Sequence, residues 1–391
     1  MNLELFQDSP SGEMVRERHG NEEYWAFVPN PLPPEVGLDM ALVNSILKAD
    51  SALSEMRGLA RNVPNLALLS HSFIRREAVL SSRIEGIHTS IIELYTYEAQ
   101  QLTAPGAGTN PNESNLLQVV NYARALGFGV ECVREGRPIS LSFIREIHGL
   151  LMEKGRGEET HPGEFRTIQN VIGNRGARLA DARFIPPPVI QMRDALHALE
   201  QYLQSNDDDP VLLRLAYVHY QFETIHPFED GNGRVGRMLI PLLLIRWGVL
   251  PQPLFNLSAY LERNRDEYCD RLLTVSRVGA WREWIEFFLR GIAEEAKDAI
   301  NRAQLMLDIR ARWQQQLHGE KHVTGTVFAA ADYIFEKPIL AAKHLQEKFR
   351  ISAPTAREAL KRLEGIGVVE ETTGAERNRV YAATELLKVM E

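Results

Sequence analysis

The chain has 391 residues, a formal net charge of −8 and two cysteines. This length accommodates two or three domains, and the negative charge argues against a general binder of nucleic acid or of anionic membranes. The two cysteines, Cys132 and Cys269, lie far apart, which excludes a disulfide framework and a cysteine metal site. Because no stretch resembles a signal peptide or reaches the ~18 apolar residues of a membrane span, we expect a cytoplasmic protein with no membrane partner.

Hydrophobic periodicity predicts a mainly α-helical fold. The chain before about Pro34 is polar and interrupted by prolines, and its one apolar cluster, 24–27, is expected to pack on the core as an arm or short strand. Predicted helices follow at 39–57, 67–84, 116–134, 142–152, 189–203, 211–225, 238–244 and 281–316. The polar segments 103–115 and 154–164 are predicted to be loops.

One short hairpin is predicted between these helices. Residues 165–172 have strand character, Gly173 and Gly176 allow a turn, and 183–185 form the returning strand. Most isolated hairpins are surface ribbons with no special function. The residues alone do not exclude that interpretation for this hairpin.

A segment rich in reactive groups, His226 to Arg237, separates the predicted helices at 211–225 and 238–244. Gly231 and Gly233 allow successive backbone N–H groups to face an anion. The start of the following helix adds partial positive charge to the same place. The turn therefore suits a phosphate group.

The side chains of this segment complete a nucleoside triphosphate site. Asn232 can donate a further hydrogen bond, and Arg234 and Arg237 lie on one helical face, where their planar forks can bind two more phosphates. Asp230 is a hard oxygen ligand suited to Mg²⁺. His226 titrates near neutral pH, so it is the natural general base.

Each of these groups also has a structural interpretation. A histidine at a helix end is usually structural, and an Asp-Gly turn beside arginine is usually a solvated cap. Their combination at fixed spacing favours chemistry. The stretch Gly231 to Gly236 also fits G-x-G-x-x-G, but a helix precedes it instead of a strand, which excludes a dinucleotide fingerprint. The chain has no P-loop lysine motif.

The segment His226 to Arg237 resembles the signature of the Fic family at every defined position. The resemblance implies a helical Fic core with a short β-hairpin flap, and transfer of AMP from ATP to a protein hydroxyl. By the same resemblance His226 is the catalytic base and Asp230 holds Mg²⁺. The resemblance further implies that the flap strand pairs with the backbone of the target protein. The nucleotide-binding residues that it implies are Gly231, Asn232 and Gly233 at the α-phosphate, Arg234 at the β-phosphate, Arg237 at the γ-phosphate, and Val235 and Gly236 between them.

A second motif lies upstream, at Ser81 to Gly86. On spacing alone, Glu85 is a surface carboxylate one residue before a glycine that ends the helix. The hexapeptide nevertheless resembles the (Ser or Thr)-x-x-x-Glu-(Gly or Asn) inhibitory motif of Fic proteins that carry it on the N-terminal side. The resemblance implies that Glu85 pairs with Arg237 and occupies the place of the γ-phosphate, so that ATP binds in an unproductive pose.

The segment 257–276 carries tyrosines at helical spacing, which are more often core residues than ligand contacts. It resembles the Fic region that lines the adenine pocket. The resemblance implies that Asn264 and Tyr268 lie near the nucleobase.

The end of the chain is predicted to be a separate unit. Three short helices at 323–335, 339–349 and 353–364, followed by strands at 368–372 and 379–382, resemble a winged helix-turn-helix. The predicted recognition helix presents Thr355, Arg357, Lys361 and Arg362. Because acidic and basic residues balance from residue 319 onwards, sequence-specific DNA binding stays open beside protein contact or formation of a homodimer.

Three domains are therefore expected: an N-terminal helical region with the inhibitory motif at 1–105, a Fic core at 106–318 and a winged helix-turn-helix at 319–391. The expected function is Mg²⁺-dependent transfer of AMP from ATP to a Ser, Thr or Tyr hydroxyl of a target protein or of the chain itself. Within enzymes, the alternatives are transfer of another nucleotide or removal of AMP. From another class, the alternative is a DNA-binding regulator that uses the Fic core as a nucleotide sensor.

Overall fold

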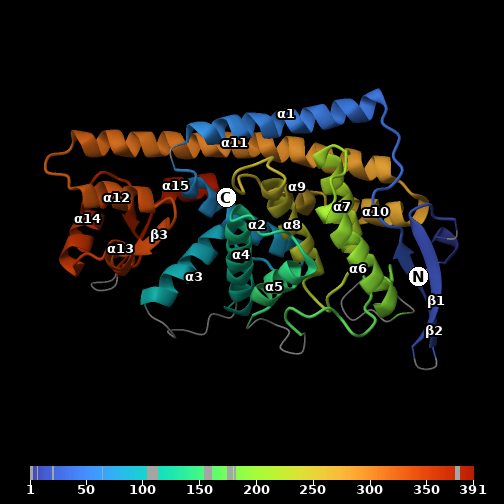
Figure 1. Ribbon diagram of the computed structural model, residues 1–391. Helices are drawn as coiled ribbons and strands as arrows, with labels where there is room; N and C mark the ends of the chain where they lie inside the picture. The colour runs from blue at the N-terminus through green and yellow to red at the C-terminus, as the bar shows by residue number, and fades with distance from the viewer. Residues whose placement is uncertain are drawn as a thin grey trace.

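The computed structural model describes residues 3–6, 8–19, 22–63, 65–103, 113–153, 161–173, 179, 182–374 and 379–391. These residues form a mainly helical molecule with two small antiparallel sheets (Figure 1). The predicted fold class is confirmed in this respect. Among the described residues, no helix is both long enough and apolar enough to cross a lipid bilayer.

Eleven helices precede the C-terminal unit in the described part of the chain: α1 Met40–Asn62, α2 Ala67–Ile84, α3 Ile91–Thr103, α4 Glu113–Arg134, α5 Leu141–Leu151, α6 Val189–Gln204, α7 Val211–Ile225, α8 Asn232–Arg246, α9 Leu257–Arg263, α10 Arg265–Val278 and α11 Trp281–Gly319. The predicted bounds of α2 and α7 are confirmed to the residue. The prediction missed α3, whose C-terminal half is mostly polar. The segment 281–316 belongs to one 39-residue helix, α11, which lies alongside α1 (Figure 1).

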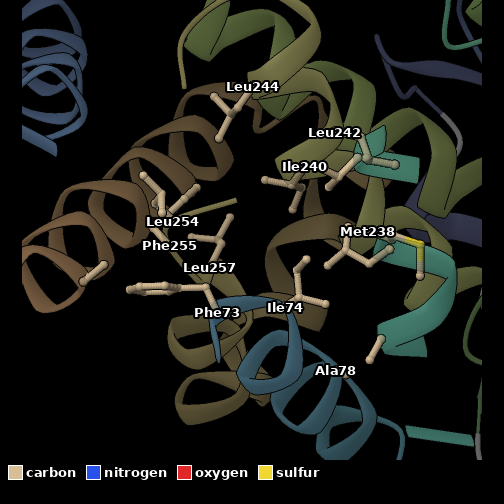
Figure 2. Packing of buried hydrophobic residues seen from close by; sticks show 14 of the residues in the cluster. Phe73, Ile74, Ala78, Met238, Ile240, Leu242, Leu244, Leu254, Phe255 and Leu257 are labelled. Atoms are coloured by element: carbon tan, nitrogen blue, oxygen red, sulfur yellow. The ribbon is translucent and has the colours of Figure 1, made fainter. Parts of the chain in front are cut away.

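The core is built around α7 and α8. Nearly every side chain of α8 is buried, since α2, α4 and α7 pack on it from different sides. Figure 2 shows apolar side chains of α2, of α8 and of the segment 254–257 gathered in one cluster. Pro241 lies inside α8. The two helices that flank the turn at 226–231 are therefore held rigidly.

An N-terminal hairpin, β1 Gly12–His19 and β2 Glu22–Pro29, packs beside this core. The predicted short strand at 24–27 lies within β2, whereas β1 was not predicted. One face of the hairpin packs Phe27 against Phe184, and the other packs Ala26 against Ile185. The N–H of Phe27 also donates to the carbonyl of Ile185 at 3.0 Å, so the hairpin supports the segment 182–185.

The C-terminal module, the described residues of 319–391, contains α12 Gly325–Tyr333, β3 Ile339–Ala341, α13 Ala342–Phe349, α14 Ala353–Gly365, β4 Glu370–Glu371, β5 Val380–Ala382 and α15 Thr384–Met390. Its sheet has the order β3-β5-β4 with antiparallel pairs. The prediction of helix from residue 339 was wrong at its start. Residues 339–341 form a strand because β5 supplies their backbone hydrogen bonds.

This module docks on α2, α3 and α11. Lys337 forms an ion pair with Glu98 of α3 at 2.6 Å, and Glu98 also pairs with Arg75 of α2 at 3.1 Å. Helix α15 packs against α2, α3 and α11, and Arg302 donates to the carbonyl of Val389 at 2.6 Å. The C-terminal module therefore contacts α2, the helix that ends at Glu85.

Candidate functional site

Helix α7 ends at His226, whose backbone is left-handed with φ 49° and ψ 61°. A residue with a β-carbon holds this conformation only where its surroundings determine it. Here the N–H of His226 donates to the carbonyl of Phe222 at 3.1 Å. The carbonyl of His226 accepts from Arg166 Nε at 3.0 Å and from Asn170 Nδ2 at 3.2 Å. The peptide groups before and after His226 are therefore both held by hydrogen bonds.

The imidazole of His226 is half-buried. Its tautomer follows from its hydrogen bond with the backbone of Glu223. Nδ1 lies 3.2 Å from the carbonyl oxygen of Glu223, which can only accept, so Nδ1 carries the proton and Nε2 keeps its lone pair. Burial lowers the pKa of His226 to about 4, although the bond to Glu223 raises it, and the charge of Arg166 lowers it further. His226 is thus neutral at pH 7 and able to accept a proton at Nε2.

The turn after His226 is pinned by the side chain of Asn232. Its Oδ1 accepts from the N–H of Phe228 and its Nδ2 donates to the carbonyl of Phe228, both at 2.8 Å. One donor of the Asn232 amide is thus used by the protein backbone, and because Nδ2 carries a second N–H, the expected side-chain bond to phosphate stays a prediction. The backbone N–H of Asn232, in the first turn of α8, can also face an anion.

Gly231 precedes α8 with φ 80°, which explains the need for glycine at this position. At Gly233 the reason is close approach: a β-carbon there would lie 2.4 Å from Glu85 Oε1. The carboxylate of Glu85 therefore lies directly on the first turn of α8. This is the place where the sequence predicts phosphate.

The two arginines of the motif are buried and point to different partners. Arg234 donates to Gln118 Oε1 at 3.2 Å and lies 3.6 Å from Asp230 Oδ2, while its Nε has no hydrogen-bond partner among the described residues. Arg237 donates to Ser81 Oγ at 2.9 Å and to Glu85 Oε1 at 2.6 Å. Buried guanidinium groups with few carboxylate partners form a strongly cationic region under the turn.

The predicted contact between Glu85 and Arg237 is present in the structure. Desolvation of the Glu85 carboxyl opposes ionisation, but the charge of Arg237 and its hydrogen bond outweigh this and lower the pKa of Glu85. The same pair raises the pKa of Arg237. The Glu85 side chain is still 40% exposed, so the carboxylate closes the site from its open side and does not belong to the core.

The residues expected near the nucleobase are tied into the protein in this structure. Tyr268 is buried and donates its hydroxyl proton to His219 Nε2 at 2.8 Å, since His219 Nδ1 bonds the carbonyl of Gly236. Asn264 joins α9 to α10, and its amide donates to the carbonyl of Tyr260 at 2.9 Å. Their contact with a nucleobase stays a prediction.

The predicted hairpin is present as two segments joined by one antiparallel bridge. Ile172 and Phe184 exchange N–H···O bonds of 2.9 and 3.1 Å. The turn was predicted at 173–176, and all of it after Gly173 lies outside the described residues. The prediction of a regular strand over 165–172 was wrong before residue 172. There the side chains of Arg166 and Asn170 bond backbone carbonyls, which takes the segment out of a strand ladder.

The sequence analysis missed His148, because no short motif marks it. His148 stacks on Phe228 with ring centroids 3.7 Å apart. Its Nε2 donates to the carbonyl of Asp230 at 3.0 Å, and its Nδ1 accepts from the N–H of Gly163 at 2.9 Å. Both ring nitrogens of this buried histidine form hydrogen bonds with backbone groups, so His148 supports the turn that carries Asp230.

The turn carries two carboxylates, of which Glu229 is 20% exposed and lies 3.5 Å from His161 Nδ1. Among the described residues, no group of three or more His, Cys, Asp or Glu side chains could hold a metal ion. Asp230 alone presents a carboxylate that is 55% exposed beside Arg234, with Oδ1 accepting from the N–H of Gly231. Since Mg²⁺ keeps several waters and binds through one or two carboxylates and substrate phosphates, the donor set fits Mg²⁺ delivered with a nucleotide.

Comparison with known proteins agrees with this geometry. Residues 138–244 match the model described as Fic/DOC family, and residues 43–131 match the model described as Fic/DOC family N-terminal. A Fic family protein from Desulfovibrio desulfuricans superposes with a TM-score of 0.56 at 20% identity, over 90% of this chain and 98% of that one. Fic-1 from Caenorhabditis elegans superposes with a TM-score of 0.50 at 19% identity, over 68% and 74% of the two chains.

Curated relatives are similar over part of their length. A probable protein adenylyltransferase from Aquifex aeolicus is 24% identical over 54% of this chain and 59% of its own length. The protein adenylyltransferase Fic of Aedes aegypti is 31% identical over 38% of this chain and 27% of its own. The chain therefore spans less than two thirds of each of these relatives.

Proposed function

From the Fic fold of this chain and its matches to two Fic/DOC family models, we propose that the protein is a protein adenylyltransferase. It transfers AMP from ATP to a Ser, Thr or Tyr hydroxyl of a target protein, or of the chain itself, and releases pyrophosphate. One observation carries this proposal: a neutral imidazole with an available Nε2 lies at the end of α7, directly before the glycine-lined start of α8.

His226 is the base in this reaction. Its Nε2 accepts the proton of the acceptor hydroxyl while the hydroxyl oxygen forms a bond to the α-phosphorus of ATP. The bond from the α-phosphorus to the bridging oxygen breaks, and its electron pair leaves with pyrophosphate. The backbone of Gly231 to Gly233 holds the α-phosphate, and the charges of Arg234 and Arg237 stabilise the departing pyrophosphate. Mg²⁺, held by Asp230 and the phosphates, supplies further charge neutralisation when bound.

Glu85 inhibits this reaction while it holds Arg237. The 2.6 Å contact between them, and the position of the carboxylate on the first turn of α8, support this proposal. An anion that is covalently part of the chain competes with the triphosphate for the same cationic region. ATP that binds while Glu85 stays in place is displaced from the alignment that attack requires.

The flap formed by the two segments around Ile172 and Phe184 receives the target. Ile168, which lies on the flap between two residues that bond the His226 carbonyl, is 58% exposed. An exposed backbone segment with an apolar side chain can pair with an extended peptide and leave its hydroxyl near the base.

For the C-terminal module we propose a winged helix-turn-helix, supported by its element order of helix, strand, two helices and two strands. A second candidate function follows, a DNA-binding regulator, because Arg357 and Lys361 are exposed on α14. Sequence-dependent DNA binding that is lost in Arg357→Ala and Lys361→Ala supports this second function. Formation of a homodimer without DNA binding supports a protein-contact role.

ATP labelled at different phosphates tests the proposed function. Label at the α-phosphate should reach protein, whereas label at the γ-phosphate should not, because AMP and not the terminal phosphoryl group is transferred. Transfer of γ-label, or a better yield with another nucleoside triphosphate, contradicts the AMP assignment. Loss of label from a protein that already carries AMP, without any forward transfer, favours the reverse reaction.

A further inference from the structure

Arg166 is a buried guanidinium that bonds only backbone carbonyls among the described residues. Its Nε donates to His226 at 3.0 Å, its NH1 to Ile168 at 3.1 Å, and its NH2 to Pro187. Its own N–H donates to the carbonyl of Pro227 at 2.9 Å. Arg166 is 1% exposed and forms no ion pair with a described carboxylate.

The three carbonyls belong to three different pieces of chain. His226 is the end of α7, Ile168 lies on the first flap segment, and Pro187 follows the second flap segment. One rigid planar group therefore joins the proposed base to both sides of the flap. A lysine could not replace it, because a single ammonium cannot reach three carbonyls in a fixed plane.

Asn170 strengthens the same link. Its Nδ2 donates to the carbonyl of His226 at 3.2 Å and to the carbonyl of Phe228 at 2.9 Å. The carbonyl of His226 thus accepts two donors from the flap segment. His226 has a β-carbon, so its left-handed backbone conformation is strained. These hydrogen bonds hold the residue in that conformation.

We infer that Arg166 is a positioning residue that fixes the orientation of His226 and joins it to the flap, with Asn170 as its second support. This inference rests on the proposed function, in which His226 is the base and the flap receives the target. The bound target is then registered against the same group that aims the imidazole, so that the acceptor hydroxyl and Nε2 meet in one fixed geometry.

The charge of Arg166 affects the pKa of His226. Measuring this pKa therefore distinguishes a positioning role from a purely structural one. The groups that act on the titration of His226 are the backbone carbonyl of Glu223, the carboxylates of Glu85 and Asp230, and Arg166. Of these, Arg166 lowers the pKa of His226 and the others raise it. Removing the guanidinium charge should therefore raise the pKa of His226 above its value of about 4.

The test compares Arg166→Gln with Arg214→Gln, both in the Glu85→Gly background. Arg214 is a matched control, since it is also buried and donates to backbone carbonyls, those of Tyr202 and Ser205, but at the other end of α7. Arg166→Gln should lower kcat about 100-fold and leave KM for ATP within about twofold, because the phosphates are held by the start of α8. Arg214→Gln should lower the melting temperature without lowering kcat selectively over KM for ATP.

Nuclear magnetic resonance titration of His226 completes the test and needs no transfer reaction. The pKa of His226 should rise in Arg166→Gln and stay unchanged in Arg166→Lys and Arg214→Gln. Equal losses of kcat in Arg166→Gln and Arg214→Gln, with an unchanged His226 titration, would overturn the inference. If Arg166→Gln does not fold, Asn170→Ala decides: kcat should fall about tenfold at constant KM for ATP, and an unchanged kcat refutes the link.

The two levels of the proposal fail differently. If the Glu85→Gly protein transfers no AMP while Arg166→Gln still shifts the His226 titration, the proposed function is wrong and Arg166 still controls the imidazole. If transfer occurs and neither kcat nor the titration depends on Arg166, the adenylyltransferase stands without this positioning residue.

Discussion

Glu85 Oε1 lies 2.6 Å from Arg237 NH2, and the same oxygen lies 2.4 Å from the position that a β-carbon of Gly233 would take. One carboxylate thus contacts both the buried arginine and the backbone at the start of α8. Ser81, one helical turn before Glu85 on α2, bonds the same guanidinium through its hydroxyl and its carbonyl. The end of α2 and the start of α8 therefore form one closed contact.

Opening this contact should increase the proposed transfer of AMP. We predict that Glu85→Gly raises self-labelling from ATP severalfold, because the γ-phosphate can then pair with Arg237. The measurement is incorporation of α-phosphate label per protein. Glu131→Gly, which removes an exposed acidic residue from α4, is the matched control and should label like the parent chain. Equal labelling of both variants would show that Glu85 does not inhibit.

The pH dependence of transfer should reflect the neutral state of His226. Since burial lowers the pKa of His226 to about 4, the base form dominates at every higher pH. The rate should therefore stay flat from about pH 8 down to about pH 5, below the value near 6.5 of an ordinary histidine. An acidic limb centred at pH 6 to 7 in initial rates of the Glu85→Gly variant would contradict this environment for the imidazole.

The stability of the fold should fall in mild acid for a related reason. Burial lowers the pKa of His219 to about 3 and that of His148 to about 4, so both stay neutral in the folded chain while they charge in the unfolded chain below about pH 6.5. The unfolded state then binds more protons. Each histidine should lower the free energy of unfolding by roughly 1.4 kcal/mol per pH unit between about pH 6.5 and 4. Urea unfolding at several pH values measures this.

Substituting His219 checks the assignment. His219→Gln should reduce the acid slope by the contribution of one histidine. An unchanged slope in His219→Gln would assign the acid sensitivity to other groups.

The docking of the C-terminal module should depend on Lys337. Removing its ammonium in Lys337→Ala leaves Glu98, which is 12% exposed, with Arg75 as its ion-pair partner. We predict faster hydrogen exchange in α3 and β3, which meet at this contact, and unchanged exchange in α7 and α8. Lys348→Ala, which breaks an ion pair within the module, is the control. Equal exchange in both variants would show that the contact does not hold the module.

The sequence predicted the features that depend on local pattern. The apolar periodicity located α2 and α7 to the residue, and the signature located the turn at 226–231 together with the start of α8. It also predicted the contact of Glu85 with Arg237 across 152 positions, which composition and spacing alone could not supply. The resemblance to a family carried that prediction.

What the sequence missed depends on contacts between distant segments. The strand at 339–341 exists because β5 returns beside it, and β1 exists because β2 pairs with it. Arg166 and His148 belong to no motif, and their importance comes from the carbonyls that folding brings to them. The bonds between the amide of Asn232 and the backbone of Phe228 were also not predicted, because periodicity cannot indicate them.

The central claim is that the imidazole of His226 accepts the proton of the acceptor hydroxyl during transfer of AMP. Mass spectrometry of the Glu85→Gly protein after incubation with ATP and Mg²⁺ tests it most directly, with Glu85→Gly/His226→Ala as the comparison. We predict peptides that carry one AMP in the first protein and none in the second, with ATP binding retained in both. Equal modification of the two proteins would contradict the claim.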